Sequence, residues 1–219
     1  MTAVKTNSAF TLAEVLITLG IIGVVAAMTI PNLMTAFAKH RVETQLVKFY
    51  STMNQAMRMS VNDNESPEGW VVSGKTYTYD ENVEFLNEYI FPYLKFSSYE
   101  NCISDASSHG VCITNIDGTI WKFKIDSNGG DILYFIDGDC LNFSHKNYFA
   151  FQFNKVSNTD GDINSTNFIE PYIHGWDGTT ENLKNHSSFG CNKDNTRPSA
   201  FCTKLIQLNS WKIPSDYPW

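Results

Sequence analysis

The sequence predicts an α+β fold in which one long amino-terminal helix packs on an antiparallel sheet. Three observations support this: an apolar run over residues 10–38, an amphipathic stripe at helical spacing after it, and later strand-like segments separated by turn residues. With 42% hydrophobic and 18% charged residues the composition is that of a globular protein. The formal charge of −7 argues against a dedicated nucleic-acid binder, so no nucleic-acid partner is expected.

The apolar run reads FTLAEVLITLGIIGVVAAMTIPNLMTAFA, and its single charge is Glu14. As a helix it would extend about 43 Å, more than the hydrocarbon core of about 30 Å, so it predicts one membrane span. A buried core helix is the alternative, but too little chain remains to wrap a helix that is apolar on every face. A cleaved secretory signal is a further alternative, for which Ala26-Ala27-Met28 is a poor cleavage site.

After Pro31 the pattern becomes amphipathic, with apolar residues three or four positions apart and charged residues among them. One continuous helix over about residues 10–60 is therefore predicted, and its second half should bury the stripe against the rest of the chain. The stripe consists of Val42, Leu46, Phe49, Met53, Met57 and Val61.

The remainder, residues 61–219, is predicted to form a globular head. Residues 62–69 have the content of a helix stop and loop, and residues 85–96 could form a short helix broken by Pro92. Three or four strands are expected over 111–115, 118–126, 131–136 and 148–153, with turns at Asp117-Gly118, Asn128-Gly129-Gly130 and Asp137-Gly138. The polar stretch 154–198 is predicted to form long surface loops.

The amino terminus resembles the type IV prepilin terminus of pilins, minor pilins and type II secretion pseudopilins. A polar leader ends in the small residue Ala9, Phe10 follows, Glu14 lies four residues later, and Pro31 interrupts the apolar run. The family usually has Gly before the cleavage site, and Ala9 departs from that pattern. The closing CTKLIQLNSWKIPSDYPW also resembles the end of a pseudopilin-like group.

The resemblance implies cleavage by a prepilin peptidase between Ala9 and Phe10 and N-methylation of Phe10. It further implies that Glu14 pairs with the Phe10 amine of a neighbouring subunit, whereas Glu14 taken alone could also snorkel to a headgroup. Pro31, with Gly20 and Gly23, makes this part of the helix easy to loosen, and the glycines could equally serve close helix contact.

These implications predict a leader at 1–9, a transmembrane and assembly helix at 10–60 and a pilin-like head at 61–219. The protein would be a structural subunit that spans the bacterial inner membrane once, with its head extracytoplasmic, before it enters a type IV pilus or type II secretion pseudopilus. The expected partners are other pilin or pseudopilin subunits, the prepilin peptidase, the inner-membrane assembly platform and membrane lipid. The alternative is a membrane-tethered extracytoplasmic binding or adhesin domain.

All five cysteines lie in the head. Outside the cytoplasm disulfides are the natural interpretation, and the spacing suggests Cys102 with Cys112 and Cys191 with Cys202, which leaves Cys140 unpaired. Reduced core cysteines are the alternative.

No motif of a known catalytic or nucleotide-binding class occurs, so neither an enzyme nor a cofactor is expected. Asp160, Asp162 and Asn164 are spaced like the opening of a calcium loop. However, Ser165 stands where that loop needs Gly and Pro171 where it needs Glu, so no metal site is predicted.

Overall fold

The computed structural model describes residues 11–65, 67, 70, 77–102, 110–126, 129–153, 168–194 and 200–219. The chain divides into two compact units, Met1–Arg41 and Val42–Trp219. Residues 160–165, which have the spacing of a calcium loop but for which no metal site is predicted, lie outside the described residues.

One helix, α1, runs from Leu12 to Asn64 and contains Pro31. It agrees with the predicted continuous helix, extending four residues beyond the expected end. From Val42 onward it carries the predicted apolar stripe, of which Val42, Leu46, Phe49, Met53 and Met57 are buried.

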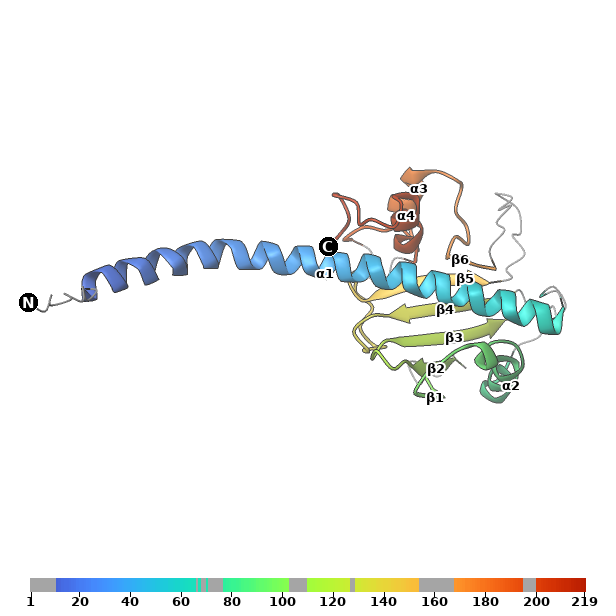
Figure 1. Cartoon of the computed structure of the whole chain (residues 1–219). Coiled ribbons are helices and arrows are strands. Elements are labelled where there is room, and N and C mark those ends of the chain that lie inside the picture. Colours follow the sequence, from blue (N-terminus) through green and yellow to red (C-terminus); the bar gives the residue numbers. More distant parts are fainter. Residues whose placement is uncertain are drawn as a thin grey trace, which may run out of the picture. The chain divides into compact units, whose positions relative to one another are not determined.

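The sheet has six strands in the order β1-β2-β3-β4-β5-β6, and every neighbouring pair is antiparallel. The order therefore follows the sequence, as in a meander (Figure 1). The strands are β1 Ser98–Asn101, β2 Val111–Thr114, β3 Ile120–Asp126, β4 Gly129–Phe135, β5 Tyr148–Phe153 and β6 Ile169–Pro171.

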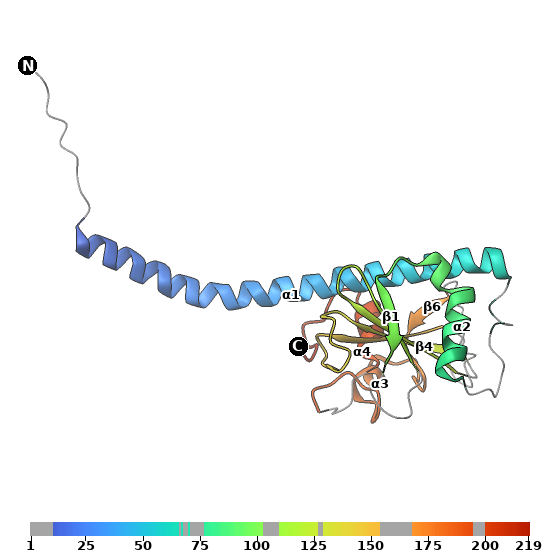
Figure 2. The ribbon, with the colours of Figure 1, turned by 90° about the horizontal axis from the view of Figure 1, so that it is seen from below.

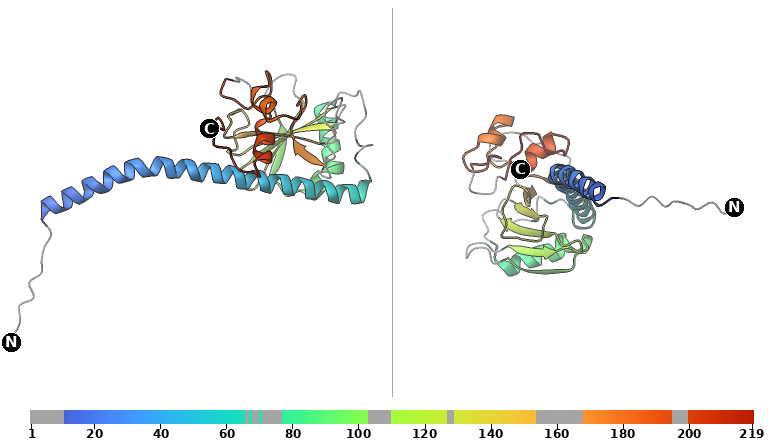
Figure 3. Two further views of the ribbon diagram at one scale, coloured as in Figure 1. Left: turned by 90° about the horizontal axis from the view of Figure 1, so that it is seen from above. Right: turned by 90° about the vertical axis from the view of Figure 1, so that its left-hand side faces the viewer.

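The short helices lie at the two ends of this strand order. Helix α2 (Tyr79–Tyr89), followed by the 3₁₀ turn η2 (Phe91–Tyr93), contacts β2 and β3, whereas α4 (Cys202–Leu208) contacts β5 and β6. Helix α3 (Thr180–Asn185) packs on α4. Two further views show α2 at the β1 end of the sheet and α3 with α4 at the β6 end (Figure 3).

The main core lies between one face of the sheet and the carboxyl-terminal part of α1. Phe49 is its centre: the ring is 1% exposed and its centroid lies 4.9, 4.8 and 4.5 Å from those of Trp121, Tyr134 and Phe151. These three residues come from β3, β4 and β5, so one helical side chain joins three strands. The opposite face of the sheet carries a smaller cluster that includes Phe135, Tyr148, Ala150 and Ala200.

The structure confirms the α+β architecture and corrects several details. The sheet has six strands rather than three or four, because β1 and β6 were missed. The region assigned to surface loops contains both β6 and α3. Helix α2 begins at Tyr79, six residues before the predicted start at Phe85, and ends before Pro92.

Two of the expected turn positions take different roles. Gly118 lies in the β2–β3 turn with a φ of +81°, a conformation that favours glycine, as the Asp117-Gly118 prediction requires. Gly129 and Gly130, by contrast, are the first residues of β4. A Cβ on Gly130 would lie 2.1 Å from the ring of Phe153, so this glycine allows an aromatic side chain of β5 to cross β4 closely.

Candidate assembly site on the amino-terminal helix

The first part of α1 presents an apolar surface with no buried residues. A stretch of 18 residues within it has a mean hydropathy of 2.2, and none of that stretch is buried. Leu12 and Met28, for example, are 77% and 70% exposed. Among the described residues, α1 is the only helix long and apolar enough to cross a membrane. An apolar surface of this size would be unfavourable in water, so this part of the helix requires lipid or other apolar helices around it.

Glu14 lies in the first turn of α1 and forms a capping box with Thr11. Oε2 of Glu14 accepts hydrogen bonds of 2.8 Å from both the backbone N–H and the hydroxyl of Thr11. In return the hydroxyl oxygen of Thr11 accepts from the backbone N–H of Glu14 at 3.2 Å. The carboxylate thus satisfies donors that the start of a helix leaves open.

Three threonines in the apolar part of α1 donate their hydroxyl hydrogen bonds within the helix. Thr18 donates to the carbonyl of Val15 at 2.9 Å, and Thr29 and Thr35 donate to carbonyls one turn earlier. Such bonds remove the cost of placing a hydroxyl in hydrocarbon. Glu14 is therefore the one residue between positions 11 and 38 that brings a formal charge into this surface.

Pro31 lies inside α1, and the helix continues on both sides of it. A proline cannot donate the backbone hydrogen bond to the carbonyl four residues earlier, here that of Ala27. The structure shows the helix formed at this position; loosening between Gly20 and Pro31 stays a prediction. The expected cleavage residues Ala9 and Phe10 lie outside the described residues.

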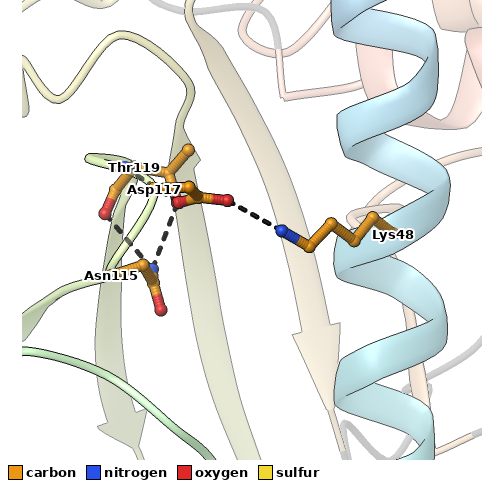
Figure 4. Close-up of polar contacts among 4 residues, drawn as sticks. All are labelled: Lys48, Asn115, Asp117 and Thr119. Carbon is orange, nitrogen blue, oxygen red and sulfur yellow. Dashed lines mark hydrogen bonds and ion pairs between the residues drawn. The ribbon is translucent and has the colours of Figure 1, made fainter.

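The carboxyl-terminal part of α1 is tied to the head by polar contacts that the sequence analysis missed. Nζ of Lys48 lies 2.9 Å from Oδ2 of Asp117 in the β2–β3 turn, and Figure 4 shows the lysine reaching from the helix to that turn. Partial burial alone would raise the pKa of Asp117. Hydrogen bonds from Lys48 and Thr119 outweigh this effect and hold the pKa below its usual range.

A second tie joins α1 to the carboxyl-terminal segment of the chain. The carboxylate of Glu43 accepts from Nζ of Lys212 at 2.8 Å and from the backbone N–H of Ile213 at 2.9 Å. About two turns further along α1, the hydroxyl of Tyr50 donates to the carboxylate of Glu170 in β6 at 2.9 Å. Together with the buried stripe these contacts fix the helix from Glu43 onward on the sheet.

Two disulfides lie in the head, and both are the pairs that the spacing suggested. Cys102 is bonded to Cys112, joining the end of β1 to β2, and Cys191 is bonded to Cys202 at the start of α4. Cys140 is free and half-buried. Within the described part of the chain, no three His, Cys, Asp or Glu side chains are grouped to hold a metal ion.

Two family models match the chain. Residues 4–30 match the prokaryotic N-terminal methylation motif, and residues 32–219 match a family of unknown function, DUF6613. The chain belongs to the DUF6613 family. No curated protein and no solved structure matches it.

This DUF6613 protein therefore carries the prepilin-type motif immediately before its family domain. The motif is that of pilin-like proteins processed by a prepilin peptidase, in agreement with the resemblance of the amino terminus. Together with the exposed apolar helix, it identifies a membrane-anchored, extracytoplasmic protein of structural type.

Proposed function

We propose that this DUF6613 protein is a structural subunit, a pilin, minor pilin or pseudopilin, that assembles through α1 into a type IV pilus or type II secretion pseudopilus. The observation that carries the proposal is the prepilin-type motif on a helix surface that is apolar, unburied and marked by one acid in its first turn. In a simple membrane anchor the acid would serve only the capping box with Thr11.

Processing would start the assembly pathway. A prepilin peptidase cleaves between Ala9 and Phe10 and the new amine of Phe10 is methylated. Before assembly, the protein resides in the inner membrane with its head on the extracytoplasmic side. Membrane lipid then covers the apolar part of α1. The assembly platform then transfers it into the filament, where the same surface packs against the helices of neighbouring subunits.

Glu14 is the residue that we propose sets the position of each subunit against the next. A carboxylate costs about 2.5 to 3.5 kcal/mol at the bilayer centre and less near the interface. Within its own chain the carboxylate accepts two hydrogen bonds from Thr11, which use two of its lone pairs. A carboxylate has further acceptor capacity, so it can also accept from the Phe10 amine of a neighbour.

Replacement of Glu14 by Val tests this role. Cells that produce the variant are sheared, and the protein is followed by immunoblot in the sheared and membrane fractions. We expect the variant to be made, inserted and processed, while the amount in the sheared fraction falls at least tenfold.

Thr18→Val is the matched control, because it also removes a polar group from the same helix but one that bonds only to its own backbone. It should reach the sheared fraction at the wild-type level. Wild-type incorporation of Glu14→Val would contradict the assembly role. An uncleaved chain that never leaves the membrane fraction would instead favour the membrane-tethered binding domain.

A further inference from the structure

The two edges of the sheet differ in how their outward-facing backbone groups are satisfied. At the β6 edge, the backbone N–H of Tyr172 donates to the carbonyl of Ala150, so alternate pairing turns the N–H and C=O of Ile169 away from β5. The side-chain amide of Asn54 on α1 bonds both groups, at 3.0 and 3.1 Å. The next outward position is Pro171, which has no N–H, so this edge is closed to another strand.

In the described part of the chain, the β1 edge has no such cover. The backbone N–H of Cys102 donates to the carbonyl of Gly110, which makes Glu100 and Cys112 the next hydrogen-bonded pair. The N–H and C=O groups of Tyr99 and Asn101 therefore point out of the sheet. All four residues of β1 are exposed, and Figure 2 shows the strand at the edge nearest the viewer.

Among the described residues, neither Tyr99 nor Asn101 has a hydrogen-bond partner for these outward groups. The edge is nevertheless held in place: the ring of Tyr99 packs 5.4 Å from Phe91 and 6.3 Å from Phe96, and the Cys102–Cys112 disulfide fixes the end of β1. It is a short strand whose two outward pairs of backbone groups have no partner among the residues that the structure describes.

The segment of the chain that contains α2 and β1 is strongly acidic. The ring contacts of Phe91 and Phe96 with Tyr99 place the residues that follow α2 beside β1. At the start of α2, burial, followed by the charges of Tyr99, Asp80 and Glu100, raises the pKa of Tyr79. Five carboxylates lie within residues 79–101 against the single Lys95; they are Asp80, Glu81, Glu84, Glu88 and Glu100.

We propose that the open β1 edge is a docking site that takes an extended, basic segment of another protein as a seventh strand. Backbone hydrogen bonds to Tyr99 and Asn101 supply the pairing, as in β-strand addition generally. The surrounding carboxylates select lysine- or arginine-bearing segments and steer them to the edge. This interaction is additional to assembly through α1 and does not depend on it.

A second copy of this chain is a poor occupant. Pairing β1 of one head with β1 of another would bring Glu100 and the acidic α2 of both chains together, in a protein whose formal charge is already −7. Like charges placed opposite one another destabilise a strand pair. The charge therefore favours a different protein as partner.

The test uses the full-length protein in detergent micelles and a fluorescent peptide of four Thr-Lys repeats, with four Thr-Glu repeats as the charge control. Binding is measured by fluorescence anisotropy at low and high salt. We expect the basic peptide to bind at least tenfold more tightly than the acidic one, with weaker binding at high salt.

Asn101→Pro removes one outward N–H without removing a bond to β2, and should weaken binding of the basic peptide about fivefold to tenfold. Glu100→Gln, which keeps the backbone and removes one charge, should have a smaller effect that disappears at high salt. Retention of the Cys102–Cys112 bond in peptide maps shows that Asn101→Pro has kept the native strand end.

Hydrogen exchange of the wild-type protein gives a readout that needs no variant. Bound peptide should slow exchange at the amides of Tyr99 and Asn101 and leave the amide of Glu100, already paired with β2, unchanged. Equal binding of the two peptides, unchanged exchange at Tyr99 and Asn101, or equal affinity of wild type and a native-like Asn101→Pro would each overturn the proposal.

Discussion

Replacing Asn54 by Ala should destabilise the folded head more than any other single polar change in α1. Asn54 is 5% exposed, and its amide donates to the carbonyls of Tyr50 and Ile169 and accepts from the N–H of Ile169. Asn54 thus satisfies the backbone of Ile169, a fully buried residue of β6 that lies 115 positions later in the sequence. Alanine offers neither a donor nor an acceptor in its place.

The magnitude follows from the groups left without partners. The N–H and C=O of Ile169 would stay buried and unbonded, and each such group costs about 1 to 3 kcal/mol. The expected loss is therefore about 2 to 6 kcal/mol in the free energy of unfolding, a large part of the stability of an ordinary domain.

The assay is denaturant unfolding of the full-length protein in detergent micelles, followed by tryptophan fluorescence. All five tryptophans, at positions 70, 121, 176, 211 and 219, lie in the head, so the signal reports that part alone. Asn87→Ala, on an exposed position of α2, is the matched control and should change stability by less than about 0.5 kcal/mol.

Asn54→Asp tests whether the loss of stability grows or shrinks as the pH falls. At neutral pH a carboxylate would face the Ile169 carbonyl without a proton to donate, so folding should raise its pKa above the usual value of about 3.9. The stability gap from wild type is then largest at pH 7 and narrows as the pH falls toward 4, where the protonated acid donates again. A loss below 1 kcal/mol for Asn54→Ala, or a gap for Asn54→Asp that widens on acidification, would refute the reasoning.

Three further outcomes are expected in the same unfolding assay or in membranes. Removing the Cys102–Cys112 bond by a double Ala substitution should cost about 3 kcal/mol, because the bridge closes a loop of sequence separation 10; a change below 1 kcal/mol would show that the bond is dispensable. Lys48→Ala should cost less than 1 kcal/mol, because the ion pair with Asp117 is largely exposed, and a larger loss would mean that the pair is not a surface contact. Thr11→Val should destabilise the first turn of α1 by about 1 kcal/mol, because it removes the capping box. The loss is measured as faster amide exchange at Glu14, and unchanged exchange would rule out the capping box.

The features that the sequence predicts well are those set by local periodicity. The stripe from Val42 to Met57 repeats at helical spacing, and its burial follows from that pattern alone. Strands β2 to β5 combine apolar or alternating residues with turn signals such as Asp117-Gly118, so their positions could be read directly.

The missed elements lack such a pattern. β1 reads SYEN and is exposed throughout, and β6 has three residues and ends in Pro171, so neither alternates between apolar and polar. They are strands because β2 and β5 offer edges to pair with, which is a tertiary effect. The start of α2 could have been found, since Thr78 and Glu81 form a capping box of the S/T-x-x-E type.

The candidate site divides in the same way. The apolar run, Glu14 and the methylation motif are contiguous in the sequence, and the capping box of Thr11 with Glu14 carries the same local signal as that of α2. The contacts of Lys48, Glu43 and Asn54 with the head join residues 69 to 170 positions apart, and no local pattern specifies those partners.

The central claim, that the protein is a processed subunit of a filament, is tested most directly by the mass of its amino-terminal peptide in sheared material. Filaments are sheared from cells, the protein is isolated from that fraction, and its amino-terminal peptide is sequenced by mass spectrometry. The account predicts a peptide that begins at Phe10 and is heavier by one methyl group. Protein that begins at Met1 in the sheared fraction, or protein cleaved at Phe10 that is confined to the membrane, would contradict it.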